Sequence, residues 1–142
     1  MRRILFLCTG NYYRSRYAEA LFNHEAARCG LDWCAFSRGL AINRAPSGLS
    51  PHAARRLTER GIPCNLTGPD PVQVDERDLL RAVRIIALNG TEHRPLIKRL
   101  YPAWADRIEC WEINDLDRST PEEAMGAIEA HVAVLMAELG ND

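Results

Sequence analysis

The chain has 142 residues, of which 46% are hydrophobic, with five cysteines and a formal net charge of −1. This length can bury one core without disulfides, so we expect a single domain over residues 1–142. The near-neutral charge gives no bulk attraction to nucleic acid or to an anionic membrane. An odd number of irregularly spaced cysteines speaks against a disulfide framework and against a zinc site, so we expect no metal.

The first residues do not resemble a targeting segment. Met1, Arg2 and Arg3 are followed by an apolar run that is too short for the core of a signal peptide and far too short to cross a bilayer. Cysteines without a disulfide pattern suit a reducing compartment. We therefore expect a soluble, cytoplasmic protein.

Apolar runs alternate with helical patterns along the whole chain. The predicted strands are residues 3–7, 33–37, 84–88 and 107–111. The predicted helices are residues 17–27, 50–62, 75–82 and 91–100, and a last one that opens at Thr120-Pro121. This alternation predicts an α/β domain of three layers, a four-stranded parallel sheet with helices on both faces. Ligands of such sheets bind at the carboxyl ends of the strands.

The segment Cys8-Thr9-Gly10-Asn11-Tyr12-Tyr13-Arg14-Ser15 follows the first predicted strand and precedes the first predicted helix. In a tight turn at this place, backbone N–H groups converge and the helix N-terminus adds positive potential. Arg14 can supply a bidentate fork for a tetrahedral oxyanion, so we expect a phosphate-binding loop. Its predicted binding residues are Thr9, Gly10, Asn11, Tyr12, Tyr13 and Ser15.

Cys8 is the predicted nucleophile of this loop. The positive field favours the thiolate, and the Ser15 hydroxyl can hydrogen-bond the sulfur. A thiolate aimed at a bound phosphate implies phosphoryl transfer through a cysteinyl-phosphate intermediate. For the other four cysteines we expect the ordinary role of a small buried hydrophobe; they are Cys29, Cys34, Cys64 and Cys110.

Cleavage of a phosphomonoester also needs an acid that protonates the leaving oxygen. The residues after the fourth predicted strand offer two candidates, Asp115 and Asp117. Both also suit a solvated loop ahead of the last helix.

Cys8-Thr9-Gly10-Asn11 with Arg14-Ser15, continued by Ala18-Glu19, resembles the signature of the low-molecular-weight protein tyrosine phosphatase family. The resemblance implies a metal-independent enzyme without a cofactor. Cys8 and Arg14 would then act with an aspartate a few residues past the fourth strand. Asp115 takes that position, although Leu116 stands where the family carries a proline. A phosphotyrosine protein or a small aryl phosphate would be the substrate.

Several residues depart from the family pattern. Tyr13 replaces a second cysteine, and no cysteine follows the third strand until Cys110, which makes arsenate reduction by a thiol relay an unfavoured alternative. A histidine-containing stretch after the second helix is missing, and all four histidines are expected at the surface: His24, His52, His93 and His131.

Tyr12 and Tyr13 suit two roles. At the rim of the loop their rings would favour a long aryl phosphate, whereas packing against neighbouring helices would give them no role in binding. The missing proline and this tyrosine pair also motivate a second hypothesis, a phosphate- or phosphopeptide-binding module with little turnover. A rhodanese-like sulfurtransferase ranks last, since its cysteine loop lies late in the domain. The sequence leaves the oligomeric state open.

Overall fold

The computed structural model of the protein describes residues 1–140, so the predicted domain 1–142 extends two residues beyond the described part. In chain order the strands and longer helices are β1 (Arg2–Cys8), α1 (Arg14–Cys29), β2 (Trp33–Gly39), α2 (Pro51–Glu59), α3 (Glu76–Arg81), β3 (Arg84–Ala87), α4 (Gly90–Leu100), β4 (Glu109–Cys110) and α5 (Pro121–Gly140). All four predicted strands and all five predicted helices are present, with shifted ends.

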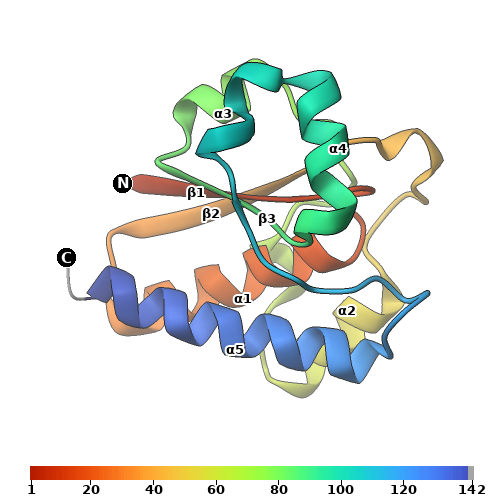
Figure 1. The fold of residues 1–142 in the computed structure, drawn as a ribbon. Helices are drawn as coiled ribbons and strands as arrows, with labels where there is room; N and C mark the ends of the chain where they lie inside the picture. The colour runs from red at the N-terminus through yellow and green to blue at the C-terminus, as the bar shows by residue number, and fades with distance from the viewer. Residues whose placement is uncertain (141–142) are drawn as a thin grey trace.

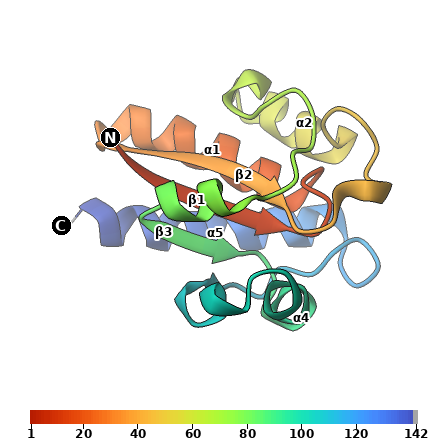
Figure 2. The ribbon, with the colours of Figure 1, turned by 90° about the horizontal axis from the view of Figure 1, so that it is seen from above.

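The four strands form one parallel sheet in the order β2-β1-β3-β4. Helices α1, α2 and α5 cover one face of the sheet, and α3 and α4 lie on the other (Figure 1). The predicted three-layer α/β fold is therefore confirmed. Figure 2 shows β1, β2 and β3 running in the same direction, so their carboxyl ends meet at one edge.

Strand β1 is the centre of the hydrophobic core. Its residues Ile4 to Leu7 are fully buried, as expected of a parallel strand covered on both faces. Ile4 and Phe6 pack in the cluster of α1, α2 and α5, whereas Leu5 and Leu7 pack in the cluster of α3 and α4. The two-residue alternation of a strand thus joins the two cores across the sheet.

The ends of the elements differ from the sequence prediction where polar residues fold inward. Helix α1 begins at Arg14 rather than residue 17, because the buried side chains of residues 14–16 are polar and interrupt the apolar periodicity. Helix α2 begins at Pro51 rather than residue 50, and the side chain of Ser50 makes no capping hydrogen bond. Thr120 and Glu123 do form the reciprocal hydrogen bonds of a capping box at the start of α5.

The expectation that four cysteines are buried is wrong. Cys29 is exposed in the last turn of α1, and Cys34, Cys64 and Cys110 are partly exposed. Of these, Cys64 and Cys110 pack against the edges of the two cores. Among residues 1–140, no helix is long and apolar enough to cross a membrane.

The last residue of β2, Gly39, leaves no room for a side chain. It pairs in register with Cys8, and a Cβ atom added to it would collide with the Ile42 side chain. The same atom would lie 3.0 Å from both the Asn11 Cβ and the Thr9 carbonyl oxygen. Gly39 therefore lets loop 9–13 (Thr9 to Tyr13) approach the sheet edge.

We expect Gly39→Ala to lower the free energy of unfolding by about 1–3 kcal/mol, since backbone and side chains must shift to admit the methyl group. Urea unfolding measures this change. Gly126→Ala is the matched control, because Gly126 lies within α5 with open space around it. There we expect a gain of about 0.4–1 kcal/mol from the loss of unfolded-state freedom. Equal destabilisation by both substitutions would contradict the role given to Gly39.

Candidate active site

Cys8 ends β1, and loop 9–13 leads directly into α1. The residues at this turn line a pocket of about 470 Å³ at the carboxyl edge of the sheet, the place where ligands of such sheets bind. Its lining includes the predicted residues Cys8, Thr9, Gly10, Tyr12, Tyr13, Arg14 and Asp115. Of the predicted residues, Asn11 and Ser15 lie behind the lining and are buried.

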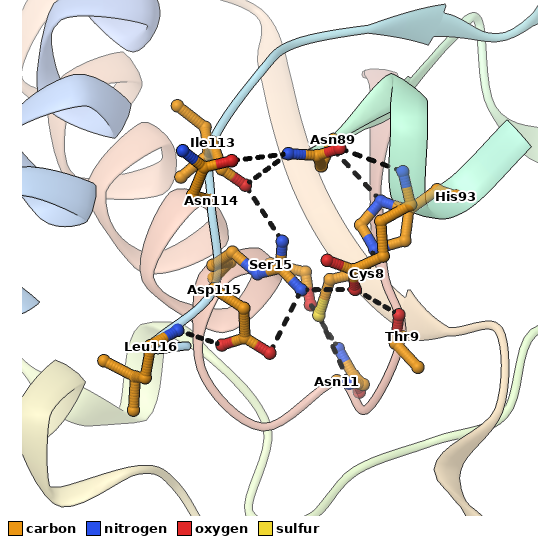
Figure 3. Close-up of polar contacts among 12 residues, drawn as sticks. Cys8, Thr9, Asn11, Ser15, Asn89, His93, Ile113, Asn114, Asp115 and Leu116 are labelled. Atoms are coloured by element: carbon orange, nitrogen blue, oxygen red, sulfur yellow. Dashed lines mark hydrogen bonds and ion pairs between the residues drawn. The ribbon is translucent and has the colours of Figure 1, made fainter. Parts of the chain in front are cut away.

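The sulfur of Cys8 is surrounded by hydrogen-bonding groups and is almost fully buried. The Asn11 N–H donates to Sγ over 3.3 Å, and Ser15 Oγ lies 2.9 Å from Sγ (Figure 3). Because Ser15 Oγ already accepts a hydrogen bond from Asn11 Nδ2, its own hydrogen is free to point at the sulfur. The sulfur thus lies within hydrogen-bonding distance of the Asn11 N–H and the Ser15 hydroxyl.

Asn11 fixes the shape of the loop. It is the one non-glycine residue with positive φ (50°) in the described chain, a conformation that Asn tolerates better than most residues. Its side chain donates to Ser15 Oγ and to Ser37 Oγ, both at 2.9 Å, and accepts from the Val72 N–H at 2.9 Å. These bonds hold the turn that directs the Asn11 N–H at Cys8.

Arg14 is buried in the first turn of α1 with its guanidinium beside the pocket. Nη1 donates to the Ile113 carbonyl at 2.9 Å, and Nη2 donates to Glu92 Oε2 at 2.7 Å and lies 3.5 Å from Asp115 Oδ2. Burial acts to lower the pKa of Arg14, but the Glu92 hydrogen bond and the charges of Cys8, Glu92 and Asp115 outweigh it and raise that pKa. The guanidinium is thus held rigidly as a cation.

Glu92 is a site residue that sequence reasoning missed. Its Oε2 accepts from Thr9 Oγ1 at 2.5 Å and from Arg14, and it lies 3.1 Å from His93 Nε2. Burial acts to raise the pKa of Glu92, yet the bonds from His93, Arg14 and Thr9 hold it well below its usual range. Its only sequence signal is its position in the first turn of a helix that follows a strand next to β1.

His93 corrects the expectation of four surface histidines. It is fully buried, and Nδ1 accepts from the Asn89 N–H at 3.0 Å (Figure 3). The proton therefore resides on Nε2, which donates to Glu92. His93 is buried because α4 begins with this ring turned back onto its own N-terminus, a contact that periodicity does not reveal.

The two candidate acids occupy different places. Asp115 lines the pocket of Cys8, and its Oδ1 accepts from the Leu116 N–H at 2.8 Å. Its side chain is about half exposed (48%). Asp117 lines two neighbouring hollows instead of this pocket. The structure brings Asp115, and not Asp117, to Arg14.

The two tyrosines differ in burial. Tyr13 is buried, its ring lies 6.3 Å from that of His52, and its hydroxyl is 3.5 Å from the Pro121 carbonyl. Burial, followed by the negative charge of Asp115, raises the pKa of Tyr13 to about 12. Tyr12 is partly exposed at the pocket wall. Tyr13 therefore packs against its neighbours while also lining the pocket, and Tyr12 lies at the pocket wall.

The sequence matches over residues 3–142 the family model described as low molecular weight phosphotyrosine protein phosphatase. It is 30% identical over 106 residues to the protein-arginine-phosphatase of Bacillus subtilis (strain 168), a match covering 74% of this chain and 67% of that protein. It is 33% identical over 72 residues to an arsenate reductase of Shouchella clausii (strain KSM-K16), covering 51% of this chain and 47% of that protein.

Two solved structures share nearly the whole fold. A low molecular weight protein tyrosine phosphatase from T. tengcongensis is 28% identical, with a TM-score of 0.79 over 98% of this chain and 100% of that one. YfkJ from Bacillus subtilis is 25% identical, with a TM-score of 0.86 over 99% of this chain and 96% of that one.

We expect Glu92→Gln to lower the free energy of unfolding at pH 7 by about 1–2 kcal/mol, because it removes the negative charge that Arg14 contacts. The effect is no larger because water screens the partly exposed carboxylate. The depressed pKa fixes the pH dependence. The stabilisation by Glu92 is complete above the ordinary glutamate pKa and declines as the pH falls below it. Urea unfolding at pH 7 and pH 3 should therefore show the two proteins converging in acid. Glu25→Gln, which breaks a surface pair with Arg28, is the control and should change stability by less than about 0.5 kcal/mol.

Proposed function

The chain belongs to the low molecular weight phosphotyrosine protein phosphatase family and is a cysteine-based phosphatase, and we propose that it hydrolyses phosphotyrosine in proteins or a small aryl phosphate. One observation carries the proposal: the Cys8 sulfur, the Arg14 guanidinium and the Asp115 carboxylate share one pocket. Nucleophile, anion binder and proton donor are the three groups that this hydrolysis needs.

In the first step the Cys8 thiolate attacks phosphorus. An S–P bond forms as the bond from phosphorus to the leaving oxygen breaks. Arg14 and the N–H groups of loop 9–13 hold the three equatorial oxygens, where charge develops in the transition state. Asp115 gives its proton to the leaving oxygen, so that a neutral phenol departs.

In the second step the Asp115 carboxylate takes a proton from water. The water oxygen attacks phosphorus, the S–P bond breaks, and Cys8 leaves as a thiolate. Inorganic phosphate is released, and the proton that Asp115 took from water restores the starting protonation state. Asp115 suits this exchange because its half-exposed side chain has access to water. Asp117 lies outside the pocket and takes no part in the proposed reaction steps.

The pocket rim supports an aryl phosphate as the substrate. Tyr12, Ala45, Pro46 and Leu116 give it apolar walls, against which a phenol ring can pack. Arg44 and His52 also line it. The positive charge of Arg44 disfavours the cationic guanidinium of phosphoarginine and attracts a phosphopeptide with acidic flanking residues. We place this reaction in the reducing cytoplasm, where the Cys8 thiolate survives, and assign it no metal or cofactor.

Hydrolysis of an aryl phosphate in the presence of a chelator tests the mechanism. Cys8→Ser should abolish turnover, because a serine hydroxyl stays protonated in this pocket. Asp115→Asn should lower kcat by roughly 100-fold or more, whereas Asp117→Asn should stay within about twofold of wild type. Trapping the phosphorylated cysteine by acid quench gives an independent readout of the S–P intermediate.

Three results would count against the proposal. Unchanged turnover by Cys8→Ser would show that Cys8 is not the nucleophile. A loss of turnover confined to Asp117→Asn would assign the general acid to Asp117 instead of Asp115. Binding of a phosphopeptide, seen as a rise in Tm, without hydrolysis by the wild type would instead identify a binding module.

The rim charge predicts the choice of substrate. Wild type should have a higher kcat/KM for a phosphotyrosine peptide than for the same peptide carrying phosphoarginine. Arg44→Glu should narrow that ratio by roughly three- to tenfold, since it reverses an exposed charge beside the pocket. Arg99→Glu, at an exposed position of α4, is the control and should leave the ratio unchanged. Preference for phosphoarginine in the wild type would contradict the proposed substrate.

A further inference from the structure

A second arginine, Arg16, lies buried directly behind loop 9–13. It is 1% exposed and does not line the Cys8 pocket. Its Nε donates to Thr67 Oγ1 at 2.5 Å, its Nη1 to the carbonyls of Asn11 and Gly48 at 3.3 Å, and its Nη2 to the Gly68 carbonyl. All three nitrogens of one guanidinium are thus engaged with protein oxygen atoms.

These four acceptors belong to three separate segments. Asn11 is in loop 9–13, Gly48 is in the connection before α2, and Thr67 and Gly68 follow a short 3₁₀ helix, Cys64–Leu66. Arg16 therefore joins the wall of the pocket to the two segments behind it. The contact with Asn11 matters most for the site. Arg16 donates to the carbonyl of Asn11, and the N–H of the same residue faces the Cys8 sulfur.

The charge of Arg16 is not neutralised by direct contact. Among the ion pairs of residues 1–140 none includes Arg16. Thr67 connects Arg16 to a carboxylate indirectly. Its hydroxyl accepts a hydrogen bond from Arg16 and donates one to Glu19 Oε1 at 2.6 Å. Burial lowers the pKa of Arg16, and the negative charges of Glu19, Asp70 and Cys8 oppose that lowering. An arginine remains a cation in such surroundings.

The groups on the pocket side of the sulfur do not supply this charge. Arg14 faces the pocket from α1, but Glu92 from α4 and Asp115 from the loop after β4 both contact it. With Asp115 protonated, as the proposed first step requires, Arg14 and Glu92 carry no net charge between them. Arg44 also lines the pocket, but it is exposed and solvent screens its charge. Arg16 adds a positive charge on the inner side of the loop, next to the hydrogen-bonding groups of Asn11 and Ser15 at the sulfur.

We propose that Arg16 is a positioning residue that holds loop 9–13 in its anion-binding shape and favours the thiolate of Cys8. The proposal rests on the function assigned above to Cys8. It gives Arg16 two separable contributions. The fork-shaped donor set bridges four acceptors, which a lysine ammonium with three donors at one point does not reproduce, whereas the positive charge is common to both residues.

The test compares Arg16→Met, Arg16→Lys and wild type by the pH dependence of Cys8 alkylation. Iodoacetamide modifies the protein over a pH series, and mass spectrometry of the Cys8 peptide separates this cysteine from the other four. We expect Arg16→Met to raise the alkylation midpoint by about one pH unit, so that alkylation at pH 6 slows roughly tenfold. Arg16→Lys should shift the midpoint by less than half as much.

Binding of inorganic phosphate tests the shape of the loop. Phosphate should raise the Tm of wild type, and this rise should be lost in Arg16→Met and reduced at least several-fold in Arg16→Lys. Arg56→Met is the matched control: Arg56 forms a partly buried pair with Glu129 away from the pocket. It should lower Tm while leaving the alkylation midpoint and the phosphate response unchanged.

The outcomes are distinct. An unchanged midpoint in folded Arg16→Met, or equal shifts in the Met and Lys variants, would overturn the contribution of charge. Should Arg16→Met fail to fold, Arg16→Lys still decides the matter of shape, because a wild-type phosphate response in that variant would overturn it. Neither measurement needs turnover, so a failed hydrolysis assay would refute the proposed function and not this role of Arg16.

Discussion

The left-handed turn at Asn11 is the constraint on which the site depends. It reverses the chain after β1 so that an N–H points back at the Cys8 sulfur, and it persists because the Asn11 side chain is bonded to Ser15, Ser37 and Val72. A strained φ is retained only where the surroundings over-determine it. Here the partners come from α1, from β2 and from the segment before α3, so the local conformation of one residue depends on its neighbour Ser15 and on two distant parts of the chain.

The second constraint is the placement of charge. Arg14 and Arg16 are two residues apart on α1, yet one contacts carboxylates beside the pocket and the other contacts carbonyls behind the loop. Buried charges cost several kcal/mol in desolvation unless hydrogen bonds compensate. Removing one partner of a buried pair leaves the other as an uncompensated buried charge. Glu92 illustrates this coupling, because a single oxygen serves Thr9, Arg14 and His93. The polar interior is therefore a connected network rather than a set of independent pairs.

The sequence was sufficient where the physics is local or periodic. The unbroken apolar run of β1 indicates a strand buried on both faces, and the spacing of Cys8 and Arg14 places a sulfur and a guanidinium at the same strand end. Glu92, His93 and Arg16 could not be found in this way. Their surroundings come from contacts between elements far apart in sequence, such as Arg16 with Thr67, and a charged residue in a helix is otherwise interpreted as solvent-facing.

The arrangement separates the chemistry from the choice of substrate. The groups proposed to attack and hold the phosphate lie at the end of β1 and the start of α1, and buried or partly buried hydrogen bonds fix them. The rim, by contrast, comes from the connections around residues 41–52 and from Leu116, and much of it is exposed. Exposed connections change with little effect on the core, whereas a change in the buried network disturbs every partner. One fold can therefore keep its buried groups while its rim changes, and the proteins that this chain resembles include ones named for tyrosine and for arginine phosphatase activity.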